Sequence, residues 1–132
     1  MNIRTEQLDV LRADRARQRE VRLAEHLRAA HGDLVAGLSD EALLHRVHAG
    51  VRRAQAYGIT WDSTLAAFLV LMFRAAPNFD EHPIVQAVLR FEDLEPDLRI
   101  DALMAVTDDE HWEEIAAKRD DRAWERALGE GR

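Results

Sequence analysis

The chain contains no cysteine among its 132 residues, which excludes several kinds of protein at once. It cannot be a small disulfide-stapled domain, bind zinc through thiolates or use a cysteine nucleophile. Its fold must therefore be stabilised mainly by burial of apolar side chains, which make up 47% of the sequence. That proportion is enough for one core and is higher than disordered chains have. We expect a single helical domain over residues 1–132.

Long apolar runs are also missing. The longest, Leu65 to Phe73, has nine residues, far fewer than the roughly 20 that a membrane-spanning helix needs. The first residues, Met1 to Gln7, lack the apolar segment of a secretory signal. The sequence therefore predicts a soluble, cytoplasmic protein with no membrane span.

Motifs for catalysis and cofactor binding are scarce as well. The two serines, Ser39 and Ser63, both stand where a helix is expected to begin, so each suits a structural role better than a nucleophile. No glycine-rich phosphate loop is present. His45 and His48 lie three residues apart on an expected helix, but the sequence nominates no third metal ligand. We predict no enzymatic activity, no metal ion and no cofactor.

Two clusters of carboxylates with histidine keep one further hypothesis open. These are Asp80-Glu81-His82 and His111-Trp112-Glu113-Glu114. The second lacks the zinc-protease spacing, in which two histidines four residues apart have a glutamate after the first. A small enzyme or a metal-binding bundle would require these side chains to converge on one pocket.

Charge is unevenly distributed along a chain whose formal net charge is -7. Residues 1–31 hold seven arginines against five acidic residues, whereas residues 92–132 hold six basic and fourteen acidic residues. The acidic C-terminal third would repel the phosphates of a nucleic acid and would attract a basic protein. The simpler interpretation is that acidic surfaces keep small proteins soluble. We predict a protein partner and no nucleic-acid partner.

Helix-forming residues dominate the sequence and strand-like alternation is absent, which predicts an all-α fold. The expected architecture is a compact, irregular bundle of five to six helices with a long N-terminal helix and short connections. The first helix, residues 1–31, is expected to begin at Thr5 and is rich in arginine, and residues 129–132 are expected to fray. The other helices are expected over residues 40–57, 60–76 and 83–91, from about residue 98, and from residue 107.

Local signals set these boundaries. Ser39 is a good N-cap residue, Gly58 ends one helix, and Thr60 is expected to cap the next. Pro83 suits the first turn of the fourth helix. The segment from Thr107 to Glu110 has the spacing of a capping box. A short link over residues 33–38 is expected between the first two helices.

The third expected helix is apolar on nearly every side between Leu65 and Phe73, which predicts that it lies at the centre of the fold. We place Trp61, at its start, in the same core. Leu23 and Leu27, one turn apart, give the later part of the first helix a buried stripe. Its middle lacks large apolar residues and is expected to project from the core or to lie on its surface.

An arginine stripe marks that middle part. Its members recur at intervals of three or four residues and are Arg12, Arg15, Arg19 and Arg22. Nucleic-acid binding is one alternative, and pairing with the interleaved Asp14, Glu20 and Glu25 is another. A long helix with so little apolar face is poorly explained by packing on its own domain. We assign the stripe to the docking of a partner protein.

The acidic end of the chain supplies the other residues that we assign to partner binding: Asp108, Asp109, Trp112, Glu113 and Trp124. Trp124 lies in a highly charged segment where a large aromatic residue has little local company, which is typical of an interface residue. Asp108 and Asp109 also suit the N-terminus of a helix, where carboxylates complement the helix dipole. A homo-oligomer is left open.

The residues around the expected junction of the second and third helices form a pattern. They are Ala54-Gln55-Ala56-Tyr57-Gly58-Ile59, then Phe68 and Leu71-Met72-Phe73, then Asn78-Phe79-Asp80 and Pro83. In this order and spacing, residues 54–91 resemble small all-helical accessory proteins encoded beside type VI secretion effector genes in Gram-negative bacteria. The resemblance covers less than a third of the chain and brings no active site. It implies a protein that helps to hold, load or neutralise a toxin partner.

We therefore expect a non-enzymatic accessory or adaptor protein that binds another protein, in its specific form a co-chaperone for a secreted bacterial effector. The alternative is an immunity protein that neutralises a basic toxin, because acidic side chains would be steered onto a basic active site. An adaptor would be required for export of the effector, whereas an immunity protein would protect cells from it.

Overall fold

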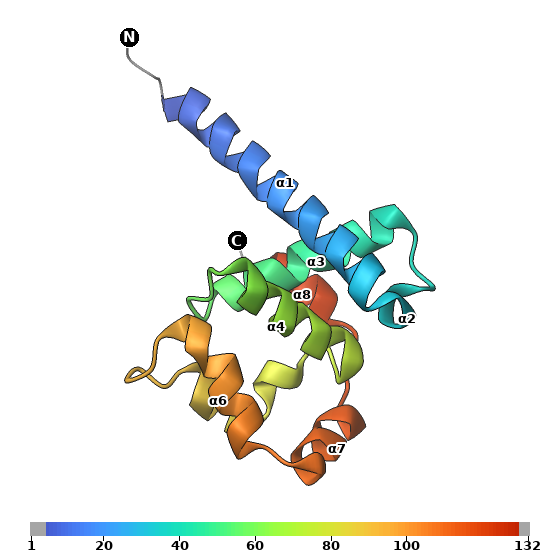
Figure 1. Ribbon diagram of the computed structural model, residues 1–132, viewed down its shortest axis with the longest axis vertical. Coiled ribbons are helices and arrows are strands. Elements are labelled where there is room, and N and C mark those ends of the chain that lie inside the picture. The colour runs from blue at the N-terminus through green and yellow to red at the C-terminus, as the bar shows by residue number, and fades with distance from the viewer. Residues whose placement is uncertain (1–4, 130–132) are drawn as a thin grey trace.

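Helices account for the regular structure, and the all-α class predicted from the sequence is confirmed (Figure 1). The computed structural model describes residues 5–129, and no strand occurs among them. The elements are α1 (Thr5–Ala30), α2 (Gly32–Val35), α3 (Asp40–Gln55), α4 (Asp62–Arg74), the 3-10 helix η1 (Phe79–Glu81), α5 (Pro83–Leu89), the 3-10 helix η2 (Pro96–Leu98), α6 (Arg99–Val106), α7 (Asp109–Ala117) and α8 (Ala123–Gly129). Of the predicted frayed tail, Gly129 ends α8 and residues 130–132 lie outside the described residues.

Short helices were missed, and the described chain has eight α-helices where five or six were expected. The predicted link over residues 33–38 contains most of α2, a single turn that is too short to show a helical periodicity. Residues 123–129 form a separate helix, α8, instead of continuing the sixth predicted helix. Four predicted ends are one or two residues too late, at residues 31, 57, 76 and 91.

Two of the predicted helix starts are confirmed at the atomic level. The Ser39 hydroxyl accepts a hydrogen bond from the Ala42 N–H at 3.1 Å, and Pro83 occupies the first turn of α5. The predicted cap at Thr107 is wrong by one residue, because Asp108 accepts from the His111 N–H and His111 Nδ1 accepts from the Asp108 N–H. The Thr107 hydroxyl instead donates to the Leu103 carbonyl at 2.7 Å.

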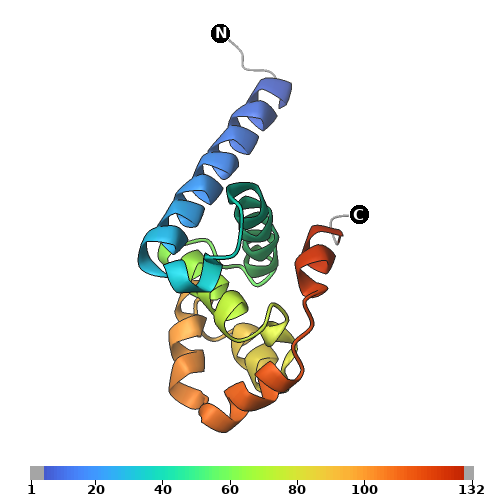
Figure 2. The same cartoon turned by 90° about the vertical axis from the view of Figure 1, so that its right-hand side faces the viewer.

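The third predicted helix does lie at the centre of the fold. As α4 it has α1 and α3 on one side and α6 on the other (Figures 1 and 2). Leu65, Phe68, Leu69 and Met72 are fully buried along it. The ring centroids of Phe68 and Phe79 lie 4.9 Å apart, so η1 closes one end of the same core. Because this helix contacts several others, its position fixes the arrangement of the rest.

The prediction that Trp61 lies in this core is wrong, since 49% of its surface is exposed. Trp61 precedes the first turn of α4 and has an extended backbone, so it does not share the helical face that Leu65 and Phe68 present to the core. Helical periodicity says nothing about a residue outside the helix.

The junction between α3 and α4 is built from one glycine and one distant carboxylate. Gly58 has a φ of +87°, in the left-handed region, and ends α3 as predicted. The predicted capping of α4 by Thr60 is wrong, because Asp97 caps it from η2. Asp97 Oδ1 accepts from the N–H groups of Thr60 at 3.0 Å and Trp61 at 2.8 Å, and Oδ2 accepts from the Thr60 hydroxyl at 3.1 Å. A carboxylate at this position also complements the dipole of α4.

Replacing Gly58 by alanine should lower the free energy of unfolding by about 1–2 kcal/mol, because a left-handed backbone is strained for any L-residue. The added Cβ would also lie 3.1 Å from Cγ of Pro96. Gly37→Ala is the matched control, since nothing lies within 4 Å of a Cβ at that position. Urea unfolding of the two variants measures the difference. Equal stabilities would contradict a conformational role for Gly58.

Replacing Asp97 by alanine should lower the free energy of unfolding by roughly 1–2 kcal/mol at neutral pH, because two backbone N–H groups lose their cap. Burial alone would raise the pKa of Asp97, but the hydrogen bonds from Trp61 and Thr60 outweigh it and hold this pKa below its ordinary value. The cap's contribution is therefore present above the ordinary carboxyl pKa and is lost as the pH falls through the lower pKa of the folded state.

The wild-type protein should consequently lose stability in acid more steeply than Asp97→Ala, measured by urea unfolding from about pH 7 to about pH 3. Asp101→Ala, an exposed acid four residues further on, is the control and should keep the wild-type pH profile. A profile of Asp97→Ala that runs parallel to the wild type would rule out this cap as a source of the acid sensitivity.

Candidate protein-interaction surfaces

The N-terminal half of α1 projects from the rest of the molecule, which confirms the expectation for the middle of this helix (Figures 1 and 2). Every described side chain from Thr5 to Gln18 is exposed, and we call this segment the α1 stem. Leu23 and Leu27 are buried further along, as predicted. One helix thus has a packed half and an unpacked half.

Two polar contacts hold α1 where the stem leaves the body. Arg19 Nε lies 3.1 Å from Oδ1 of Asp62, in the first turn of α4. Both carboxylate oxygens of Glu20 lie 2.9 Å from Nδ1 of His48 on α3. The direction of the stem is therefore set by one contact to α4 and one to α3.

The predicted arginine stripe is only partly free. Arg19 is held by Asp62, and Arg12 lies 3.6 Å from Asp9 within the helix. Arg15 and Arg22 are exposed and form no ion pair with any described residue. The alternative that the interleaved acids neutralise the stripe is wrong for Glu20, which pairs with His48 because it faces α3.

Apolar side chains accompany these arginines. Leu8 and Leu11 are exposed on the stem, Leu11 over 52% of its surface. Leu8, Leu11 and Arg15 follow one another at intervals of three and four residues, so they share one face of the helix. The stem thus presents a face that is both basic and apolar.

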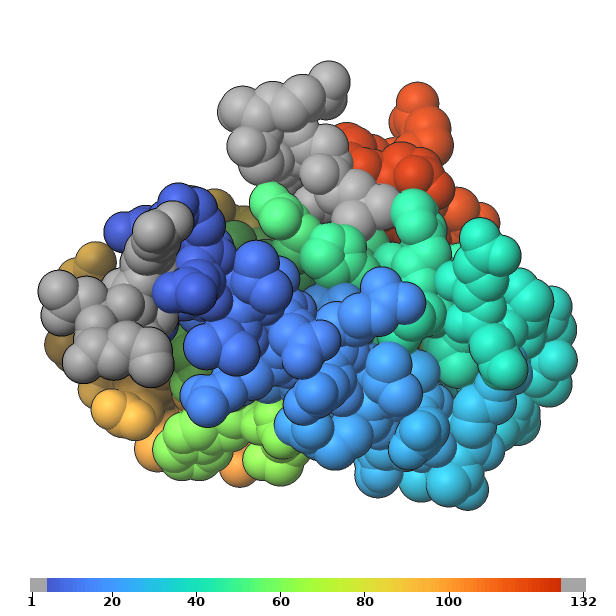
Figure 3. Space-filling model, turned by 90° about the horizontal axis from the view of Figure 1, so that it is seen from above, coloured from blue at the N-terminus to red at the C-terminus, as the bar shows by residue number. Residues whose placement is uncertain are grey.

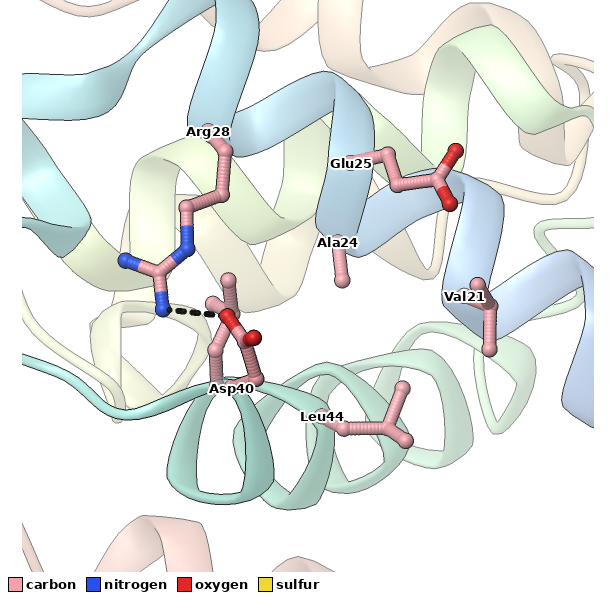
Figure 4. A pocket seen from close by; sticks show the side chains of 7 residues that line it. Val21, Ala24, Glu25, Arg28, Asp40 and Leu44 are labelled. Atoms are coloured by element: carbon pink, nitrogen blue, oxygen red, sulfur yellow. Dashed lines mark hydrogen bonds and ion pairs between the residues drawn. The ribbon is translucent and has the colours of Figure 1, made fainter.

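A shallow apolar groove lies between α1 and α3, beyond the base of the stem. Figure 3 views α1 lengthwise across this face of the molecule, with α3 along one side of it. The cavity measures about 240 Å³, and its apolar lining consists of Val21, Ala24, Leu43 and Leu44. Arg28 and Asp40 meet at one end, 3.0 Å apart, and Val21 lies at the other (Figure 4). The groove therefore adds apolar surface next to the stem.

Two of the partner residues predicted in the acidic C-terminal third, Asp108 and Trp112, make hydrogen bonds within the protein. Asp108 is consumed as the cap of α7, whereas Asp109 and Glu113 are exposed and form no ion pair with a described residue. Trp112 is half-buried, donates from Nε1 to the Thr107 hydroxyl at 3.1 Å and has its ring centroid 6.3 Å from that of Phe79. Asp108 is exposed as well, so all three carboxylates can meet another molecule, and their assignment to a partner stays a prediction.

The assignment of Trp124 to a partner contact is wrong, because its side chain is buried within the protein, with only 3% of its surface exposed. Its ring centroid lies 4.9 Å from that of Phe73 and 5.3 Å from the guanidinium carbon of Arg46. The charged neighbours of Trp124 in the sequence predict an exposed side chain. In the structure, Arg46 of α3 and Phe73 of α4 pack against its ring instead. Trp124 anchors α8 to the body, while its indole N–H has no hydrogen-bond partner in the described structure.

A buried polar cluster surrounds Arg53 and Asp80, and the sequence did not predict it as a cluster. Arg53 Nε donates to Asp80 Oδ1 at 2.7 Å, and the Tyr57 hydroxyl donates to Asp80 Oδ2 at 2.6 Å. Gln86 donates to the Tyr57 hydroxyl at 2.9 Å and to the Asp80 carbonyl at 2.8 Å. Burial, and then the Asp80 charge, raise the pKa of Tyr57, so its hydroxyl stays a donor.

This cluster extends to the C-terminal segment. Glu81 accepts from Arg53 at 2.8 Å and from Arg126 at 2.7 Å, and Arg126 also donates to Asp120 at 2.9 Å. Hydrogen bonds from Arg122 and Arg126 hold the pKa of Asp120 well below its usual range. Since these charged groups bind one another, the arrangement stabilises the fold. Glu81 and Asp120 also line a cavity of about 350 Å³, together with His82 and Lys118.

The histidines do not form one site. His45 pairs with Glu125 at 3.6 Å, His48 with Glu20, and His82 with Glu114 at 2.9 Å, while His82 and His111 are in edge-to-face contact. Within the described residues, no group of three or more histidine and acidic side chains could hold a metal ion. The predicted lack of enzymatic activity stays a prediction.

Among residues 5–129, no helix combines the length and the apolar character that crossing a bilayer requires.

Comparisons with models of protein families, with curated proteins and with solved structures find no match for this chain. The resemblance of residues 54–91 to accessory proteins of type VI secretion therefore stays a prediction that rests on the sequence.

Replacing Arg53 by alanine should lower the free energy of unfolding by about 3–5 kcal/mol, because Asp80 would be left buried without its counter-charge. Arg52→Ala is the matched control, since Arg52 precedes it on the exposed side of α3 and should change stability by less than about 0.5 kcal/mol. Chemical unfolding of both variants measures the contrast. Similar losses in the two variants would show that the buried pair is not a special source of stability.

Proposed function

We propose that this protein is a non-enzymatic adaptor that binds another protein through the α1 stem. The observation that carries the proposal is the exposure of every described side chain from Thr5 to Gln18. Only the second half of α1 buries apolar side chains in the core, so the exposed first half contributes little to the stability of the fold. The first half is best explained as a surface for another molecule.

Energetics support a docking role for the stem. Isolated helices shorter than roughly 12–15 residues are marginal in water, so the stem depends on its continuation into the packed half of α1 and on its good helix formers. Full burial of Leu8 or Leu11 against a partner would contribute up to about 1.5–3 kcal/mol each. Arg15 and Arg22 are free to pair with acidic groups of that partner.

The partner that we propose is a secreted bacterial effector, and the protein would act as its co-chaperone or adaptor before export. This part of the proposal rests on the resemblance of residues 54–91. The binding surface itself rests on the geometry of α1, so the two parts can be tested separately.

Two variants of the stem test the binding surface. Arg15 and Arg17 are both exposed and lie two residues apart, so they point roughly 200° away from each other around the helix. Arg15→Glu should weaken binding to a partner captured from the native host by about tenfold, whereas Arg17→Glu, with the same change of charge, should weaken it far less. Quantitative mass spectrometry of the captured protein measures both.

Equal recovery of every captured protein with both variants would overturn the assignment of the surface. Recovery of this protein alone, with no stoichiometric partner in any variant, would overturn the adaptor function itself. Circular dichroism of each variant confirms that the helix content is unchanged, because both substitutions are at exposed positions.

A second candidate function is favoured by the exposed carboxylates Asp109 and Glu113 and by the acidic C-terminal third. These groups suit an immunity protein that covers the basic surface of a toxin. Co-expression with the toxin separates the two functions. An immunity protein rescues the cells, whereas an adaptor gives no protection and is instead required for export.

A further inference from the structure

Large apolar side chains are exposed in two parts of the described chain. One set belongs to α1 and consists of Leu8, Val10, Leu11 and Val21. The other set surrounds α6 and consists of Trp61, Phe91, Leu98, Met104 and Val106. The second set includes two aromatic residues, and aromatic residues are the side chains most enriched where proteins bind one another. None of the residues of this second set belongs to α1.

The backbone brings Trp61 next to the start of α6. Asp97 Oδ1 accepts the hydrogen bond of the Trp61 N–H at 2.8 Å, and Leu98 is the next residue in the chain. Pro96 packs so closely on Gly58 that a Cβ there would lie 3.1 Å from its Cγ. The segment that leads into α6 is therefore fixed against the α3–α4 junction, and Trp61 and Leu98 project from adjoining backbone.

One face of α6 continues this patch. Leu98, Asp101 and Met104 follow one another at intervals of three residues and are all exposed, Leu98 over 41% and Met104 over 50% of its surface. The opposite face buries Ile100 and Leu103 in the core. We call Trp61, Leu98, Asp101 and Met104 the α6 surface, and Phe91 lies exposed at the beginning of the segment that leads to it.

Charge around the α6 surface is predominantly negative. Residues 91–106 contain five acidic residues and a single basic one, Arg99. Arg99 keeps its positive charge, but its guanidinium is half-buried and donates to the carbonyls of Leu94 and Leu89 at 2.8 Å each, so these donors are already engaged within the protein. Asp97 is occupied by the cap of α4. The remaining acids are exposed and form no ion pair with a described residue: Glu92, Asp93, Glu95 and Asp101.

Basic groups lie on two sides of this surface. Next to Trp61, Arg19 pairs with Asp62 at 3.1 Å. Arg22 lines a pocket with Asp62 and Ser63. Arg90 is exposed just before this segment, and its guanidinium carbon lies 5.9 Å from the ring centroid of Tyr57. It therefore lies at the edge that faces the α3–α4 junction. An apolar patch with aromatic anchors and unpaired carboxylates is complementary to a ligand that carries apolar side chains and positive charges.

We propose that the α6 surface binds a basic amphipathic helix of another protein. Its apolar side chains contact Trp61, Leu98 and Met104, and its lysines and arginines pair with Asp101 and the neighbouring acids. Nucleic acids and anionic lipid surfaces are disfavoured, because the same carboxylates repel their phosphates. This surface lies on other elements than the stem and takes a ligand of the opposite charge, so the inference stands independently of the adaptor function.

The test uses the full chain and a synthetic probe, a helical peptide of about 18 residues, near the length of common helix-in-groove ligands. The peptide contains Leu, Ala and Lys, with leucine on one face and lysine on the other, and carries a fluorescent label. A second peptide has glutamate in place of every lysine. Fluorescence anisotropy measures the binding of each to the wild-type protein and to variants.

The lysine peptide should bind with a Kd on the order of micromolar, and the glutamate peptide should not bind. Trp61→Ala should weaken binding by about tenfold or more, since an aromatic anchor contributes most of the energy of such a contact. Asp101→Lys should weaken it by a similar factor. Asp33→Lys, which makes the same charge change at an exposed position of α2, should leave the Kd within about twofold.

Further controls separate this surface from the stem. Arg15→Glu on the stem should not reduce peptide binding, and thermal unfolding checks that each variant is folded. Equal binding of the lysine and glutamate peptides, or wild-type binding by both Trp61→Ala and Asp101→Lys, overturns the proposal. Self-association of the wild type that Trp61→Ala abolishes also overturns it, because the occupant would then be a second copy of this chain.

Discussion

The ion pair of Arg53 and Asp80 ties together elements that are distant in the sequence. Arg53 comes from α3 and Asp80 from η1, and both side chains are buried. Tyr57, in the turn after α3, and Gln86 on α5 bind the same aspartate, while Glu81 binds both Arg53 and Arg126 of α8. A buried charge is tolerated only when it is paired and hydrogen-bonded. These residues therefore specify one relative placement of α3, η1 and α5 around α4, beyond what apolar packing alone would specify.

The body that results contrasts with the α1 stem. Residues from Arg19 onward are fixed by the contact of Arg19 to Asp62, by that of Glu20 to His48 and by the burial of Leu23 and Leu27. The side chains of the stem are exposed, and so its arginines and leucines are available to another molecule at no cost to the core. The α6 surface is built differently. Asp97 binds the backbone N–H of Trp61, and the Trp61 side chain is exposed next to it. The two surfaces differ in charge, and a protein that joins two partners needs such a difference for specificity.

Short-range rules predicted what depends on neighbours in the sequence. Ser39, Gly58 and Pro83 act on their own turn of the chain, and the periodicity of Leu65 to Phe73 reports a helix buried on most sides. The sequence predicts a buried Trp61 and an exposed Trp124, whereas the structure shows the reverse. The exposure of each residue depends on side chains from other elements. Asp97 caps a helix that begins more than thirty residues earlier, and no local pattern marks it. Asp80 was noticed for its composition, but its partner Arg53 could be found only in the folded structure.

The central claim is that α1 consists of a packed half and an exposed half. Hydrogen exchange of the backbone amides along α1, in the protein without a partner, tests it most directly. Amides from the second turn to Gln18 should exchange close to the rate of an isolated helix, while those from Leu23 to Ala30 should be protected to a degree near that of α4. Uniform protection from one end of α1 to the other would contradict the account, because the stem would then be covered in the protein alone.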